Sequence, residues 1–320
     1  MVLDLITSIL LVFFSSLLFV NAVEYVGFKL NLSKSFIGTI ISPLFTSFPE
    51  LVIFLVAVFE IGSYSGSQEA IGTIFGETFM SSSISYTLVF FSILVGSVTI
   101  KNFKKTIRVE KTLSIPYIFI SILFPFTLLP YFIHITYIPI AIIFLLAYII
   151  YFYIIYKNNE AEMFEETEKP YFAKFIGNKL GTALQIFISA LLIYLGSRFL
   201  LNSILSISMN LHLSILAISI VLIPSATAIP ETITAMIWAY REKYTLSIGS
   251  LVGEKILYST IYPGIALLLV PWNLDIYVFL SVLVTTLVSV VYSIIIMKGK
   301  FSTYYLLLGF IFFIIYAMMI

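Results

Sequence analysis

The sequence predicts an all-α polytopic membrane protein, with ten transmembrane helices arranged as two inverted five-helix repeats. Three observations lead to this prediction. Of the 320 residues, 61% are hydrophobic and only 10% are charged, whereas soluble domains carry about 25% charged residues. The apolar residues gather in runs of about 20, the length of a helix that crosses a bilayer. A short motif of two prolines, a threonine and a glutamate occurs twice, once in each half of the chain.

The ten expected helices follow from the apolar runs. The first run has no basic n-region and no small-residue cleavage site, so we expect a membrane helix there and not a removed signal peptide. The expected helices cover residues 3–26, 35–59, 68–98, 113–132, 134–156, 181–207, 213–239, 245–270, 275–297 and 302–320.

A polar stretch at 157–179 separates the first five runs from the last five. We therefore expect a first repeat at 1–156, an acidic cytoplasmic linker at 157–180 and a second repeat at 181–320. Charge runs are usually solvated, which favours a plain linker. A regulatory cation site is the alternative, although the spacing of the linker glutamates matches no calcium-binding loop.

Basic residues predict the orientation, because cytoplasmic loops of membrane proteins are enriched in lysine and arginine. All but two of the 17 lysines and arginines lie in loops that follow odd-numbered helices. We therefore expect those loops in the cytoplasm, both termini outside, and a multi-pass protein of the cell membrane. The exceptions fall inside helices. Lys255 either neutralises Glu254 or points away and snorkels, and Arg198 is expected to pair with the first helix or with lipid.

The two halves align with each other. The spacing of Glu50 and Glu231 aligns residues 10–50 with residues 191–231 without gaps, and both prolines of the motif fall in register. A second match, at a slightly shorter spacing, aligns 71–77 with 248–254. Because each half has an odd number of helices, the second half is inverted relative to the first. Inverted repeats place a transport site at their interface, near the middle of the bilayer.

The doubled motif reads PLFTSFPE at 43–50 and PSATAIPE at 224–231. Each proline removes a backbone donor and disrupts the helix, and the freed carbonyls persist at membrane depth only beside protein or a hydrated cavity. Carbonyls, hydroxyls and carboxylates are the oxygen ligands of hard cations. The alternative is a pair of proline kinks with hydrogen-bonded side chains. The side-chain ligands expected from the motif are Thr46, Ser47, Glu50, Thr227 and Glu231.

Two further carboxylates lie inside apolar helices. Glu77 and Glu254 each follow a GxxxG pattern, and such glycines let another helix approach closely. Because charged residues in membrane helices are costly and usually functional, we expect these glutamates to be ligands or proton carriers.

The motif resembles the GTSLPE-type repeat of sodium/calcium exchangers in the cation/Ca²⁺ exchanger superfamily, and the IGxxxGE segments resemble the family's GNxxGS segment. The resemblance covers essentially the whole chain and points to a prokaryotic-type member with diverged ion-site residues. It implies alternating-access exchange of Ca²⁺ for a monovalent cation. It also implies that Glu50 and Glu231 are calcium ligands, with Thr46, Ser47 and Thr227 beside them.

The departures from the family pattern concern the sodium chemistry. Glu77 and Glu254 stand where the family has a serine that binds sodium, and Ser81 and Tyr258 stand where it has Asn or Asp. Four carboxylates in a low-dielectric interior repel one another and cannot all stay ionised without cations. We therefore favour H⁺ over Na⁺ as the ion exchanged for the divalent cation.

Other functions fit the sequence less well. There are no cysteines, and no arrangement of the two histidines and two aspartates matches an intramembrane protease, so we expect no enzyme and no cofactor. The expected partners are inorganic cations and the lipid bilayer, with no nucleic acid. The alternative function is a transport-inactive homologue that binds or senses cations, which the changes at Ser81, Tyr258 and Ala228 would allow.

Overall fold

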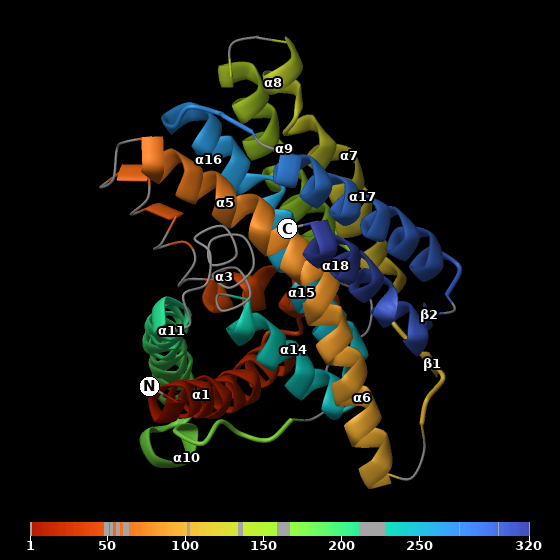
Figure 1. The fold of residues 1–320 in the computed structure, drawn as a ribbon. Coiled ribbons are helices and arrows are strands. Elements are labelled where there is room, and N and C mark those ends of the chain that lie inside the picture. The colour runs from red at the N-terminus through yellow and green to blue at the C-terminus, as the bar shows by residue number, and fades with distance from the viewer. Residues whose placement is uncertain are drawn as a thin grey trace.

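Long apolar helices account for most of the structure (Figure 1). The structure is a computed structural model that describes residues 2–47, 51, 54–55, 58–59, 64–100, 103–133, 137–158, 167–210, 228–274, 276–299 and 301–319. Six helices within this part of the chain are long and apolar enough to span a bilayer: Leu3–Lys29, Ala70–Val98, Lys111–Ile133, Tyr137–Lys157, Asn178–Leu200 and Val278–Met297.

The elements follow the expected order along the chain. The first half holds α1 (Val2–Lys29), α2 (Lys34–Phe36), η1 (Ile37–Ile41), α3 (Ser42–Thr46), α5 (Tyr64–Met80), η2 (Ser81–Ser85), α6 (Tyr86–Ile100), β1 (Thr106–Ile107), η3 (Lys111–Leu113), α7 (Ser114–Phe126), α8 (Leu129–Ile133) and α9 (Tyr137–Lys157). The second half holds α10 (Ala173–Ile176), α11 (Asn178–Asn210), α14 (Ile229–Tyr240), α15 (Tyr244–Tyr258), α16 (Ile261–Leu269), α17 (Ile276–Met297), β2 (Phe301–Ser302), η5 (Thr303–Leu307) and α18 (Leu308–Met319).

The distribution of polar and apolar side chains is that of a membrane protein. Large apolar side chains such as Phe14 on α1 and Ile149 on α9 are exposed, whereas many serines and threonines and four glutamates of the described residues are buried. A soluble protein of this size would not present such long apolar faces to water. The apolar outer surface and polar interior therefore fit a bilayer environment, with the polar groups facing one another inside the bundle.

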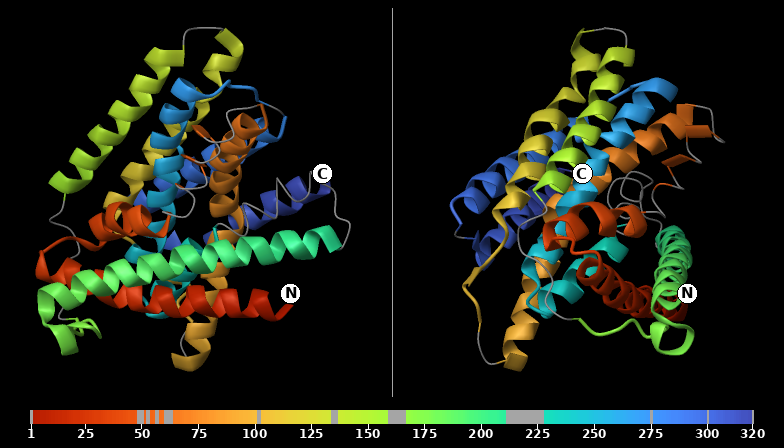
Figure 2. Two further views of the ribbon diagram at one scale, coloured as in Figure 1. Left: turned by 90° about the vertical axis from the view of Figure 1, so that its left-hand side faces the viewer. Right: turned by 180° about the vertical axis from the view of Figure 1, so that it is seen from behind.

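The helices pack in pairs around α15. The long helices α1 and α11 lie side by side and run in opposite directions (Figure 2). In the same way α7 packs along α17, α9 along α16, and α14 along α6. Every residue of α15 is buried, because η1, α3, α5, α7 and α14 surround it. This central helix brings the residues of the second GxxxG segment into the middle of the protein.

Pro43, the first of the two prolines in the first motif, is accommodated by a wide turn of the helix. Residues 37–41 form a π-helix, η1, directly before α3, in which Pro43 is one of the first two residues. Proline has no N–H and collides with the carbonyl of the residue four places earlier, here Thr39. The π-turn relieves this collision, and such turns recur at functional sites. The expected helix at 35–59 is thus irregular where the motif begins.

Two segments differ from the expected single helices. The run 245–270 is divided at Ser259 and Thr260 into α15 and α16, because Pro263 cannot donate the hydrogen bond that would continue the helix. The run 302–320 begins with a strand and a 3₁₀ turn before α18. The strand β2 pairs antiparallel with β1, so the expected all-α fold contains one short ribbon, which joins the loops that follow α6 and α17.

Candidate cation site

Three of the four predicted carboxylates lie in the described interior. Glu77 on α5, Glu231 on α14 and Glu254 on α15 are each about 1% exposed. Glu77 is close enough to Glu231 and Glu254 to interact electrostatically with both. Among the residues that the structure describes, however, they do not converge closely enough to form a ready-made metal centre. The fourth carboxylate, Glu50, lies outside the described residues, as does Thr227.

The position of Glu254 follows from close packing at the glycines before it. The Cα of Gly249 lies against Gly38 of η1, where an added Cβ on Gly38 would come within 3.2 Å of it. A Cβ on Gly253 would lie 2.3 Å from the carbonyl oxygen of Thr39 and 2.7 Å from Pro43. Pro43 cannot donate a hydrogen bond to the Thr39 carbonyl. The backbone of Thr39 instead packs directly against Gly253, which has no side chain to keep it away. Glu254 is therefore held beside the first motif.

Glu231 occupies the first turn of α14, directly after Pro230. The start of a helix carries a partial positive charge that favours a carboxylate. The neighbouring Thr232 donates a 2.7 Å hydrogen bond to Ser85 of η2. This bond ties the start of α14 to the π-helical turn that follows Glu77.

The polar residues of the first motif are buried near α15. Thr46 and Ser47 are about 1% and 2% exposed, and the Thr46 hydroxyl donates to the carbonyl of Ser42 at 3.1 Å. The hydroxyl of Ser47 has no hydrogen-bond partner among the described residues. A buried hydroxyl without a partner is costly, so a ligand or water beside Ser47 would stabilise the site.

Ser81 lies next to Glu254, where a hydroxyl could share a cation with the carboxylate. Its hydroxyl is 3.5 Å from one carboxylate oxygen of Glu254 and 3.5 Å from the carbonyl oxygen of Leu251. The second carboxylate oxygen of Glu254 has no hydrogen-bond partner among the described residues. Tyr258 is buried and stacks on Tyr262, with ring centroids 4.3 Å apart.

Several residues in this interior were not predicted from the sequence. They are Ser82, Ser85 and Thr232, together with Tyr86, Tyr117 and Thr285. The sequence signal was the run SSSIS at 81–85, which is unusually polar for the middle of a membrane helix and forms the π-helix η2. The tyrosines had no such signal, because the chain has 21 of them.

The two basic residues inside helices have different environments. Lys255 is fully buried, so the snorkelling alternative is wrong. Its ammonium lies over the rings of Tyr86 and Tyr117 and donates to the hydroxyl of Ser82. Arg198 is exposed on α11, on the outer face of the bundle.

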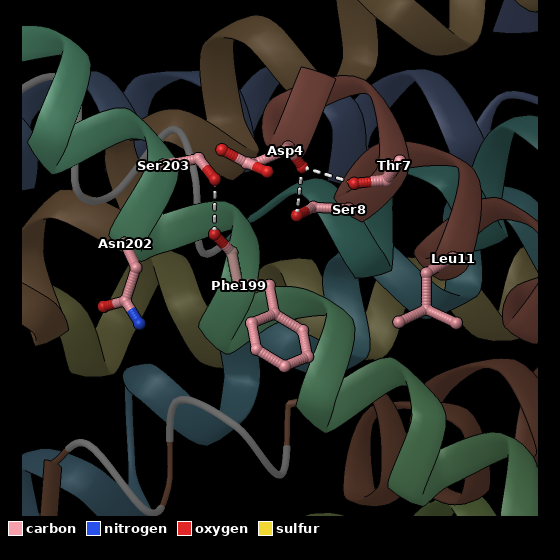
Figure 3. Close-up of a pocket in the computed structure, with 7 residues that line it drawn as sticks. All are labelled: Asp4, Thr7, Ser8, Leu11, Phe199, Asn202 and Ser203. Carbon is pink, nitrogen blue, oxygen red and sulfur yellow. Dashed lines mark hydrogen bonds between the residues drawn. The ribbon is translucent and has the colours of Figure 1, made fainter. Parts of the chain in front are cut away.

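Two cavities are lined by residues other than Glu77, Glu231 and Glu254. One, of about 600 Å³, separates the outer parts of α1 and α11 (Figure 3) and is lined by Asp4, Thr7, Ser8, Leu11, Phe199, Asn202 and Ser203. The other, of about 310 Å³, is basic and is lined by Lys34, Lys104, Thr106, Ile107, Arg108, Glu242, Lys243, Tyr244 and Thr245. It gathers residues from three of the loops that the charge pattern places in the cytoplasm.

These features define a class of protein: a multi-pass membrane protein with carboxylates and hydroxyls in its interior, as ion transporters have. The model of the family described as sodium/calcium exchanger protein matches residues 2–157 and 182–320. The chain therefore belongs to the sodium/calcium exchanger protein family, which is a family of membrane transporters and not of enzymes.

Solved structures show the same fold. A structure of the sodium-calcium exchanger NCX_Mj superposes with a TM-score of 0.76 at 18% identity, covering 100% of this chain and 98% of that one. A structure of the H⁺/Ca²⁺ exchanger CAX superposes with a TM-score of 0.73 at 18% identity, covering 99% of this chain and 81% of that one. No curated protein matches the chain in sequence.

Proposed function

We propose that the protein is a secondary active antiporter that exchanges a divalent cation, with Ca²⁺ favoured, for H⁺ or Na⁺ by alternating access. Membership of the sodium/calcium exchanger protein family supports cation/Ca²⁺ exchange. The single observation that supports the site is the gathering of Glu77, Glu231 and Glu254 in one buried, electrostatically connected interior. Buried carboxylates in such proximity need cations or protons to balance their charge.

The proposed cation ligands are Glu50, Glu77, Glu231 and Glu254, with Thr46, Ser47, Ser81 and Thr227. Among the described residues, the Ser47 hydroxyl and one carboxylate oxygen of Glu254 have no hydrogen-bond partner. This supports the assignment, because hard cations bind oxygen ligands and would satisfy both atoms. Glu77, Glu231 and Glu254 lie too far apart in the described structure for direct metal ligation by all three. Charge neutralisation by a cation would favour a closer arrangement of the same groups.

The proposed architecture is ten transmembrane helices in two inverted five-helix repeats, at 1–156 and 181–320, joined by the linker at 157–180. Two features support it. The family model matches two separate segments on either side of the linker. In addition, α1 packs on α11 and α7 on α17, which are the pairs that the repeat makes equivalent.

The proposed orientation has both termini outside the cell membrane. The basic cavity supports it, because Lys34, Lys104 and Lys243 come from three different loops and line one pocket. Clustered basic residues on one side of a membrane protein are typical of its cytoplasmic face.

For the monovalent ion we favour H⁺. Glu77 and Glu254 stand where the resembled family pattern has serines, and a glutamate carries a proton where a serine cannot. When the divalent cation leaves, protonation relieves the repulsion among the remaining carboxylates.

The test is ion flux in proteoliposomes that contain the purified protein. Ca²⁺, Mg²⁺ and Mn²⁺ are each supplied against Na⁺ and H⁺ gradients, and we expect Ca²⁺ uptake driven by an outward H⁺ gradient. Uptake that required a Na⁺ gradient and ignored pH would refute the choice of H⁺. Glu231→Gln is expected to abolish flux, whereas Glu242→Gln is the matched control, because Glu242 is an exposed glutamate bonded to Lys104.

The alternative is a transport-inactive homologue that binds or senses cations. The observation that favours it is Tyr258, which stands where the family pattern has an Asn or Asp and stacks on Tyr262. Calcium-dependent thermal stabilisation without flux would identify such a sensor. Neither stabilisation nor flux would refute both functions.

A further inference from the structure

In the part of the interior that the structure describes, a basic side chain lies beside the proposed cation ligands. Lys255 follows Glu254 directly and is fully buried. Its ammonium is 3.4 Å from the Ser82 hydroxyl, 4.6 Å from the centroid of the Tyr86 ring and 5.2 Å from that of Tyr117. The contacts with two aromatic faces and a hydroxyl stabilise the ammonium and oppose the cost of burying its charge.

Several elements build this environment. Ser82 comes from η2, Tyr86 from the start of α6 and Tyr117 from α7. The tyrosine hydroxyls bond to each other, and the Tyr292 ring of α17 packs against both rings at 5.0 and 5.4 Å. Residues from four elements therefore surround the ammonium and hold it within the bundle.

The Lys255 ammonium lies near the Glu254 carboxylate without forming a direct ion pair. Lys255 and Glu254 interact through their charges. Among the described residues, no carboxylate lies within ion-pair distance of the ammonium. The carboxylate oxygens of Glu254 thus remain available for a transported ion while the lysine lowers the net negative charge of the interior.

The two halves of the chain differ at this position. In the register that aligns Glu77 with Glu254, Lys255 aligns with Thr78. The hydroxyl of Thr78 bonds to the carbonyls of Ile74 and Phe75 in its own helix and contributes no charge. The lysine therefore adds one positive charge to a site that the repeat would otherwise leave more negative.

We propose that Lys255 is a tethered cation that takes the place of one transported monovalent ion. The proposal rests on the proposed antiport function. With the ammonium fixed in the protein, the site needs one mobile positive charge fewer to balance its carboxylates. The carrier then moves one monovalent ion fewer for each divalent ion than the same site without the lysine. Lys255 in this way sets the coupling ratio, although it is not itself a ligand of the divalent cation.

The test compares wild type with Lys255→Met and Lys255→Arg in proteoliposomes at a clamped membrane potential. The measurement is the monovalent gradient that stops net Ca²⁺ flux against a fixed Ca²⁺ gradient, which gives the coupling ratio. We expect the ratio to rise by one monovalent ion in Lys255→Met and to stay at the wild-type value in Lys255→Arg. An unchanged ratio in a transporting Lys255→Met would overturn the proposal and reduce Lys255 to a packing role.

A second measurement applies if Lys255→Met does not transport. The melting temperature of detergent-solubilised protein is recorded with Na⁺, with Li⁺ or with choline as the only monovalent cation. We expect Na⁺ or Li⁺ to stabilise Lys255→Met more than wild type, because a small cation can enter the place that the ammonium leaves. Equal responses to Na⁺, Li⁺ and choline in Lys255→Met would contradict the proposal. Absence of divalent flux in wild type would instead contradict the antiport function.

Discussion

The contact between Gly253 and the first motif gives a prediction that the structure makes quantitative. In Gly253→Ala the new methyl group would lie 2.3 Å from the Thr39 carbonyl oxygen and 2.6 Å from the Thr39 Cα. Ordinary contacts of this kind begin near 3.4 Å, so α15 and η1 must separate by about 1 Å, since backbone atoms cannot rotate away. Overpacking of this kind costs about 1–3 kcal/mol.

The matched control is Gly72→Ala, at the first glycine of the other GxxxG segment. Gly72 is helical and exposed, and an added Cβ would meet no atom within 4 Å in the part of the chain that the structure describes. Alanine there is expected to stabilise the helix by about 0.5–1 kcal/mol, because glycine loses more backbone freedom on folding. The two substitutions add the same methyl group. Opposite changes in stability would therefore show that the effect of Gly253→Ala comes from its packing contact.

The assay is thermal unfolding in detergent, with and without Ca²⁺, followed by flux. We expect Gly253→Ala to melt roughly 2–12 °C below wild type and to lose most Ca²⁺-dependent stabilisation, because Glu254 moves away from the motif. Gly72→Ala should melt at or above the wild-type temperature with normal flux. If both variants melt alike and transport alike, the contact between Gly253 and Thr39 does not position the site.

Further predictions concern two ion pairs that join different parts of the chain, and the proposed ligand Glu77. Glu24 is buried and accepts hydrogen bonds from Trp238 at 3.0 Å and from Lys243 at 2.6 Å. Glu24→Gln should therefore lower stability by about 1–3 kcal/mol, seen as a lower melting temperature. Lys104→Met breaks an exposed ion pair instead and should change stability by about 0–1 kcal/mol; an equal loss in both variants would contradict the burial argument. Glu77→Gln should weaken Ca²⁺-dependent stabilisation at least tenfold in Ca²⁺ concentration, and an unchanged titration would remove Glu77 from the ligand set.

The sequence predicted the membrane class and the polar interior because their signals are strong and local. Burial of Glu77, Glu231 and Glu254 followed from the cost of a charge in an apolar helix. The close approach at Gly253 followed from the GxxxG pattern. Family membership, which the resemblance of the motif implied, is confirmed by the family model.

Other features could not be predicted, because they depend on tertiary contacts. The hydrogen bond between Thr232 and Ser85 joins residues 147 positions apart, and no local pattern pairs them. The orientation of Lys255 was left open since a lysine beside a buried glutamate can point either way along a helix. Its burial is set by Tyr86 and Tyr117, which come from other helices. The division between α15 and α16 was missed although Pro263 was visible in the sequence.

The measurement that tests the central claim most directly is uphill accumulation of Ca²⁺ in sealed proteoliposomes. A pH gradient is imposed so that H⁺ leaves the vesicles, no Ca²⁺ gradient is present at the start, and internal Ca²⁺ is followed with radioactive tracer. Wild type is predicted to accumulate Ca²⁺ above its external concentration, and Glu231→Gln, which removes one buried carboxylate charge, is predicted to accumulate none. A Glu231→Gln protein that accumulates Ca²⁺ as wild type does, or a folded wild type that accumulates none with either an H⁺ or a Na⁺ gradient, would contradict the account.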